Sequence, residues 1–194
     1  MIRSERAAQM ACSVAAAARA RGFAERDVDA VARVLETAMS PRLEGLPDGH
    51  DPSFLHPGRT ALVLLNDVGQ VDTSVLVVGM LHESCDAELR VTPARLAELV
   101  GPSGAAAIES IPLPGDENMI ERLVALGPGV SLAALAERLD HLRHLHLRAD
   151  RMDSWGDIHD EVLRAWLPFA QRVHPLLTRR YAHWVRTFAA RIGA

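Results

Sequence analysis

The chain has 194 residues, 48% of them hydrophobic, and a formal net charge of −4 at pH 7. This length suits one domain with a substantial core, and the apolar content excludes disorder of the whole chain. The charge argues against a nucleic-acid binder, which would carry a basic stripe. With two cysteines, no secretory signal and no apolar run of the roughly 18 residues that a membrane span needs, we expect a cytoplasmic protein.

Helical periodicity recurs along the whole chain, whereas alternating apolar and polar stretches typical of strands are almost absent. The pattern therefore predicts an all-α fold, and we expect a single domain over residues 1–194. Helices are expected over 4–21, 26–39, 54–68, 71–86, 92–100, 103–110, 116–126, 130–147, 155–174 and 177–192.

Prolines and glycines predict where several helices begin and end. Pro41 predicts that the second helix ends at the residue before it, and the segment 41–53, with its three prolines and two glycines, is expected to be a loop. Thr92 is a candidate cap for a helix with Pro93 at its first position. Pro168 lies inside an apolar helical pattern, where it should kink or break the helix.

Two apolar stripes mark the C-terminal part of the chain. Stripes at helical spacing usually belong to a core rather than to a cofactor site, so we expect both to pack inside. His159 and His183 lie among them and are interpreted as hydrogen-bonded packing residues. The first stripe is Ile158, Val162, Trp166, Phe169 and Val173, and the second is Tyr181, Trp184, Val185, Phe188 and Ile192.

Imidazole and carboxylate side chains occur on three of the expected helices. His56 precedes a proline, His82 and Glu83 follow an apolar run, and Glu137 lies in a long helix further on. These donor groups suit a first-row divalent ion, and an ion in a helical pocket is a ready site for phosphate-ester hydrolysis.

The order and spacing of these motifs resemble those of the HD-type phosphohydrolases. The closest likeness is to the guanosine tetraphosphate hydrolases, meaning the RelA/SpoT hydrolase domain and the small metazoan SpoT homologue. The likeness covers about 50–175 and implies a single HD-domain-like helical domain. The motifs that carry it are F-L-H-P-G from Phe54, G-M-L-H-E from Gly79, L-A-E-R-L from Leu135 and W-L-P-F-A-Q-R from Trp166.

The resemblance implies a metal centre and a role for each residue around it. The metal ligands would be His56, His82, Glu83 and Glu137, with Mn²⁺ as the favoured ion. Asp86 would orient the attacking water beside Glu83, and Arg138 and Arg143 would contact phosphate. The substrate would be a small phosphorylated molecule or a nucleotide, and self-association into a homo-oligomer stays open.

Several positions depart from the family pattern. Both ligand aspartates of the family are glutamates here, and the extra methylene moves each carboxylate by about 1.5 Å. Ala87 replaces the second acid of a Glu-Asp pair, and His141 stands where an asparagine is expected. These departures motivate an alternative: a catalytically degraded HD-like domain that regulates or senses a ligand. A third option is a helical interaction protein that kept only the fold.

The segment before His56 also departs from the family, which has a run of Arg and Lys there. Between Pro41 and Leu55, Arg42 faces three acids, Glu44, Asp48 and Asp51. A multiply charged pyrophosphate would need guanidinium groups at this place. The sequence therefore predicts poor hydrolysis of guanosine tetraphosphate and a better fit for a monophosphate or a phosphodiester.

The long helix around Glu137 also allows a plainer interpretation. Glu137, Arg138 and Asp140 would form a solvated helix face with ion pairs at helical spacing. His141 and His144 share one face, and we interpret them as an exposed flank or as partners of the ligands rather than as a second metal site.

Overall fold

The structure is a computed structural model that describes residues 3–45, 53–83, 91–112, 116 and 118–193. This part of the chain is all-α and contains no strand, as the periodicity predicts. The helices are α1 (Arg3–Ala20), α2 (Glu25–Gly45), α3 (His56–Val63), α4 (Thr73–Leu81), α5 (Pro93–Glu109), α6 (Met119–Ala125), α7 (Pro128–His144), α8 (Trp155–Glu161), α9 (Leu167–Val173) and α10 (Pro175–Ile192).

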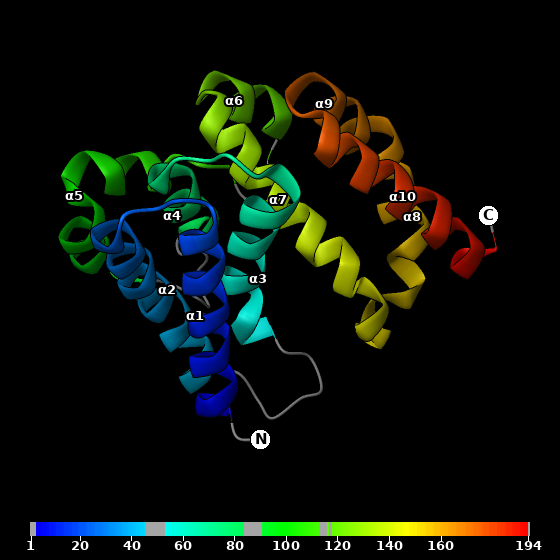
Figure 1. Cartoon of the computed structure of the whole chain (residues 1–194). Coiled ribbons are helices and arrows are strands. Elements are labelled where there is room, and N and C mark those ends of the chain that lie inside the picture. Colours follow the sequence, from blue (N-terminus) through cyan, green and yellow to red (C-terminus); the bar gives the residue numbers. More distant parts are fainter. Residues whose placement is uncertain (1–2, 46–52, 84–90, 113–115, 117, 194) are drawn as a thin grey trace.

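Helix α7 runs obliquely through the middle of the molecule (Figure 1). It packs against α3 and α4 on one side and against α9 and α10 on the other. The run Ala133–Ala136 is buried, and its three alanines let neighbouring helices approach α7 closely. Side chains at successive positions of α7 therefore reach both halves of the fold.

The apolar residues form one continuous core that extends from α1 to α10. Both predicted stripes contribute to it, because Val162, Trp166 and Phe169 of the first and Tyr181 and Trp184 of the second are buried. No helix in the described ranges is both long and apolar enough to cross a bilayer.

Polar groups of the C-terminal stripes tie α10 to α7. The Tyr181 hydroxyl donates to the Leu135 carbonyl at 2.8 Å, and Trp184 Nε1 donates to the Leu142 carbonyl at 2.8 Å. The ring of His159 hydrogen-bonds the Val185 carbonyl at 3.1 Å, which confirms its packing role. The prediction that His183 is a packing residue is wrong, because His183 lies on the exposed side of α10.

Several predicted helix ends are found, but the helix expected over 71–86 already ends at Leu81. The Thr92 side chain accepts a hydrogen bond from the Arg95 amide at 3.3 Å, and Pro93 opens α5. The predicted end before Pro41 is wrong, because α2 continues to Gly45. The residue before a proline disfavours the helical region but does not forbid it.

The helix break expected at Pro168 occurs just before it, as a π-helical turn. A π-helical turn, Val162–Trp166, separates α8 from α9, and Pro168 falls in the first turn of α9. Proline is tolerated there because its missing N–H is not needed in a first turn. A second π-helical turn, Leu64–Val68, follows α3.

Candidate metal centre

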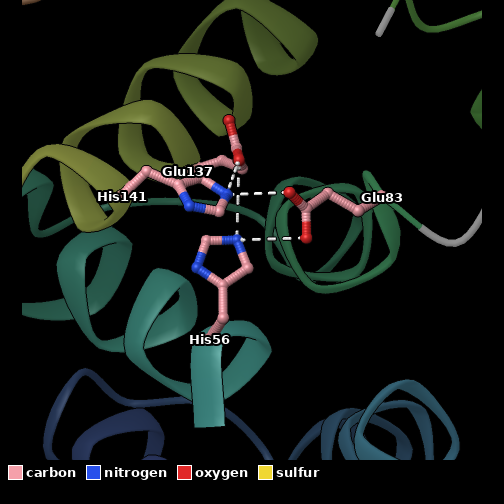
Figure 2. A group of neighbouring side chains, drawn as sticks. All are labelled: His56, Glu83, Glu137 and His141. Carbon is pink, nitrogen blue, oxygen red and sulfur yellow. Dashed lines mark hydrogen bonds and ion pairs between the residues drawn. The ribbon is translucent and has the colours of Figure 1, made fainter. Parts of the chain in front are cut away.

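Four side chains converge at the junction of α3, α4 and α7 (Figure 2). His56 is the first residue of α3, Glu83 follows the end of α4, and Glu137 and His141 lie one turn apart on α7. Each offers one ligand atom, and these four atoms lie within 4.8 Å of one another. This His/Glu cluster, called the metal cluster below, could hold a metal ion.

The local sequence explains how the ligands reach one point. Pro57 lies in the first turn of α3, where its fixed φ suits the helix start that carries His56. Glu83 lies just beyond α4, so it is free of the constraint that turns neighbouring helical residues about 100° apart. Glu137 and His141 lie four positions apart in the sequence and share one face of α7.

The separations within the metal cluster fit one ion. His56 Nε2 lies 3.6 Å from Glu137 Oε1 and 3.7 Å from Glu83 Oε2. His141 Nε2 lies 2.7 Å from a carboxylate oxygen of each glutamate. Ligands about 2.1 Å from a tetrahedral or octahedral ion lie about 3.0 to 3.4 Å apart, and the observed separations bracket that range.

Two of the converging atoms are buried and accept or donate no hydrogen bond within the described part of the chain. His56 Nε2 and Glu137 Oε1 have no hydrogen-bond partner among the residues that the structure describes. The contact of Glu137 Oε1 with His141 is short but lacks hydrogen-bond geometry. Buried polar atoms without partners are costly, so this donor set fits a bound cation.

Asp140 fixes the orientation of the His56 ring. His56 Nδ1 donates to Asp140 Oδ2 at 2.7 Å, which turns Nε2 toward the metal cluster. Arg59 Nε donates to both Asp140 oxygens at 3.0 and 2.9 Å. His144 Nδ1 donates to the Asp140 carbonyl at 2.8 Å.

The charge of Asp140 is stable in this setting. Burial alone would raise the pKa of Asp140, but hydrogen bonds from His144 and His56 and the positive charges of His56 and Arg59 lower the pKa well below its ordinary value. Asp140 therefore stays ionised at neutral pH and keeps accepting the His56 proton.

The metal cluster holds two ionised carboxylates beside a protonated imidazole. Burial alone would lower the pKa of His141, but the negative charge of Glu137 and the hydrogen bond and charge of Glu83 raise it to about 10. Burial opposes the ionisation of Glu83, yet the hydrogen bond from His141 and the charge of His56 lower its pKa to about 2. The pKa of Glu137 is also lowered well below its ordinary value, against the effect of burial and chiefly by the His141 charge.

The structure brings together three of the four predicted ligands, His56, Glu83 and Glu137. His82, the C-cap of α4, is buried close enough to Glu137 to help lower the pKa of that carboxyl, but it is not one of the four converging residues. Both of its ring nitrogens lack a partner within the described part of the chain. The predicted water-orienting Asp86 lies outside the described residues.

The two predicted phosphate contacts have other partners. Arg138 Nη2 donates to Glu161 at 2.9 Å, and its guanidinium lies 5.5 Å from the Trp166 ring centre. Arg143 Nη2 donates to Asp67 at 2.7 Å. Neither of these hydrogen bonds is made to a residue of the metal cluster.

Sequence reasoning missed the roles of His141 and Asp140. The solvated-face interpretation is wrong for Glu137 and Asp140, which are each 2% exposed. The signal was the spacing on α7, where residues 137, 140, 141 and 144 fall on one face. His144 contacts Asp140, in line with its interpretation as a partner of the ligands.

Comparison with known proteins finds no family model and no curated protein that matches the chain. The likeness to HD-type phosphohydrolases therefore rests on the ordered motifs of the sequence. The function has to be argued from those motifs and from the geometry of the metal cluster.

Proposed function

We propose that the chain is a metal-dependent phosphohydrolase of the HD type that acts on a small phosphorylated molecule or a nucleotide. The observation that carries this proposal is the buried convergence of His56, Glu83, Glu137 and His141 on one point. Three of them follow the order of the HD motifs along the chain. A helical junction where two imidazoles and two carboxylates converge suits a divalent cation rather than an apolar ligand.

The ion would be held by the metal cluster, with His82 as a neighbouring candidate, and Mn²⁺ suits the mixed nitrogen and oxygen donors. When bound, such an ion lowers the pKa of a water and offsets negative charge on a phosphate group. The buried setting strengthens these electrostatic effects, because the local dielectric is low.

Residues of the chain orient the His56 ring, and the site is exposed to solvent on the side of His141. Asp140, held by Arg59, keeps Nε2 of His56 turned toward the metal cluster. The side chain of His141 is 43% exposed, whereas that of Glu137 is 3% exposed. A phosphate group therefore approaches past His141. The Glu83 carboxylate, 17% exposed, is the candidate acceptor for the proton of an attacking water.

A second candidate is a degraded HD-like domain that senses a ligand without turnover. The ion pair of His141 with both glutamates favours it, because a protonated imidazole balances the carboxylates without an ion. The glutamates in place of the family's aspartates point the same way. Such a domain would keep the fold and the binding pocket and lack hydrolysis.

Metal content tests the first part of the proposal. We expect the purified protein to carry about one divalent ion per chain, and His56→Ala to lose it. Glu109→Gln, on the distant helix α5, serves as the control and should keep the ion. Elemental analysis of all three proteins, with helicity checked by circular dichroism, gives the result. A metal-free wild-type protein that also fails to take up Mn²⁺ would overturn the metal centre.

Turnover separates the enzyme from the sensor. The metal-loaded protein should hydrolyse some members of a panel of nucleoside monophosphates and sugar phosphates, with release of phosphate, or of cyclic diesters, with ring opening to the monoester. Glu83→Gln should abolish this hydrolysis. A protein that holds its ion and hydrolyses no member of the panel would favour the sensing domain instead.

A further inference from the structure

A groove between α7 and α10 collects positive charge. It is a cavity of about 350 Å³ whose walls come from the second half of α7, the short turn after it and α10. No carboxylate lines it among the residues that the structure describes. The basic side chains at its surface are Arg143, His146, Arg180, His183 and Arg191.

Two of these arginines are held in place by one largely buried acid, Asp67. Asp67 Oδ2 accepts from Arg143 Nη2, and Asp67 Oδ1 accepts from Arg180 Nη2, both at 2.7 Å. The Asp67 side chain is 10% exposed and belongs to the π-helical turn Leu64–Val68. Such turns are frequent at functional sites, and this one presents Asp67 to both guanidinium groups.

The arrangement leaves net positive charge for a ligand. Asp67 balances one of the two guanidinium groups that it orders, and Arg191 adds another. Because Arg143 and Arg180 are fixed side by side, a ligand would not have to restrict their side-chain freedom again. Paired guanidinium forks match the oxygens of a phosphate group.

The floor of the groove is apolar and closed. The Trp184 and Phe188 rings stack with their centres 4.5 Å apart and are nearly buried. An apolar floor lowers the local dielectric and strengthens attraction to an anion. The size of the cavity fits a small ligand, and the net charge of −4 argues against a long polyanion such as nucleic acid.

The groove lies near the metal cluster but is lined by none of its four residues. Arg143 and Arg180 also line a second cavity of about 350 Å³, together with Arg59, Asp140 and His144. That second cavity contains the groups that orient His56. The arginine pair therefore stands between the groove and the residues behind the metal cluster.

From these observations we infer that the groove lined by Arg143, Arg180 and Arg191 is a binding site for a small phosphate-bearing anion. The site does not need the metal cluster, so it goes beyond the proposed hydrolysis. Its occupant is either a free phosphorylated ligand or a distal phosphate of the substrate, and the two share the same chemistry.

Binding of pyrophosphate to the metal-free protein tests the inference. Isothermal titration calorimetry is done in EDTA with the full chain, and we expect saturable binding of one pyrophosphate per chain. Arg180→Gln and Arg191→Gln should each weaken it by about tenfold or more, the loss of a charge-assisted hydrogen bond. Arg186→Gln is the matched control, because Arg186 is exposed on α10 and does not line the groove.

A variant in the metal cluster locates the binding. His141→Gln should leave pyrophosphate affinity in EDTA unchanged, whereas a loss equal to that of Arg180→Gln would place the anion at the metal cluster, whose protonated imidazole this variant removes, and overturn the inference. Equal binding of acetate, or no saturable binding at all, would also overturn it. Inhibition of ester hydrolysis by pyrophosphate then distinguishes the two sources. Competitive inhibition indicates that the groove binds a distal phosphate of the substrate, and its absence indicates a separate ligand. Because the titration is metal-free, its failure leaves metal content and hydrolysis untouched.

Discussion

Asp140 decides which nitrogen of His56 is offered to the metal cluster. Its carboxylate accepts the Nδ1 proton at 2.7 Å and is itself fixed by Arg59. Carboxylates that orient a ligating imidazole in this way also raise its basicity. The capacity of the metal cluster for an ion therefore depends on a residue that does not touch the ion.

Asp140→Asn should weaken metal binding by about 10- to 100-fold, because the neutral amide supports the His56 ring less well. The measurement is Mn²⁺ affinity by titration calorimetry. Asp67→Asn is the control, since Asp67 is also a buried acid paired with arginines but lies outside the metal cluster. Equal Mn²⁺ affinity in Asp140→Asn and the wild type would contradict the role given to Asp140.

Metal binding should release a proton and strengthen as pH rises. In the metal-free protein the pKa of His141 is raised to about 10, so its ring is protonated at pH 7 and must lose a proton to bind an ion. The pKa of Glu83 is lowered to about 2, so Glu83 contributes no proton. Burial alone would lower the pKa of His56, but its hydrogen bond to Asp140 and the charge of Glu83 raise it, so His56 also gives up any proton on Nε2. Affinity should rise by up to about tenfold per pH unit for each proton released. Calorimetry in two buffers of different ionisation enthalpy counts the protons, and a count of zero would exclude His141 as a ligand.

His82→Ala should remove the ion and leave helicity nearly unchanged. A buried imidazole with no partner on either nitrogen, next to Glu137, is explained by a ligand that completes its bonding. The measurement is metal content together with circular dichroism. Full metal content in His82→Ala would leave His141 as the second imidazole ligand and remove His82 from the site.

The sequence predicted some of these residues and not others for a physical reason. The resemblance supplied His56, Glu83 and Glu137, because motif order survives when side chains change. Asp140 and His141 were not predicted as site residues, because a charged or polar residue on a helix is exposed unless another element covers it. Only the packing of α3 against α7 shows that this face is covered.

At the scale of elements, the approach of α3 to α4 positions three of the site residues. Gly79 of α4 lies against α3, and a Cβ there would meet Leu64 Cδ1 at 2.9 Å and Thr60 Cγ2 at 3.3 Å. Both neighbours are fully buried and have little room to move. The helix that ends at His82 therefore lies as close to the helix of His56 as a glycine allows.

Gly79→Ala should destabilise the fold by about 1–3 kcal/mol, the usual cost of overpacking a core. It should also weaken metal binding, since α4 would shift relative to α3. Gly156→Ala is the matched control, because its Cβ would meet nothing within 4 Å and alanine favours a helix by about 0.5–1 kcal/mol. Urea unfolding of both variants gives the comparison, and equal stabilities would show that α3 and α4 can separate without cost.

The presence of each helix was predictable because the spacing of apolar residues is a local property. Helix ends were predictable where a capping side chain or a proline determines the conformation of the adjacent backbone. Thr92 caps α5 as expected. The continuation of α2 through Pro41 was not, because the favourable contacts of the rest of the helix outweigh the local preference of one residue. The π-helical turn before Pro168 also has no local sequence signal.

At the scale of the whole molecule, the distribution of charge bears on the substrate. Between Pro41 and Leu55 the sequence contains one arginine, Arg42, and three acids, whereas Arg143, Arg180 and Arg191 line the groove between α7 and α10. A 3′-pyrophosphate brings several negative charges to the ion, which offsets about two of them. The segment before His56 does not supply the rest.

We therefore expect a lower kcat/KM for guanosine tetraphosphate than for the best monophosphate or diester. The measurement is a manganese-supplemented assay across these substrates. Efficient and selective release of pyrophosphate from guanosine tetraphosphate would contradict the expectation. Arg180→Gln would then tell whether the arginine groove supplies the missing charge, with Arg186→Gln as the control.

The two hydrogen bonds from α10 fix the rotational register of α7. Tyr181 and Trp184 hold the carbonyls of Leu135 and Leu142, two turns apart, so α7 cannot turn about its axis without losing both. One extra residue inserted after Leu135 would rotate the following part of α7 by about 100°. The insertion would carry Glu137 and His141 away from His56 and bring Ala136 and Asp140 round in their place. The convergence of the four side chains thus depends on an angular alignment that a helix on the opposite side of α7 maintains.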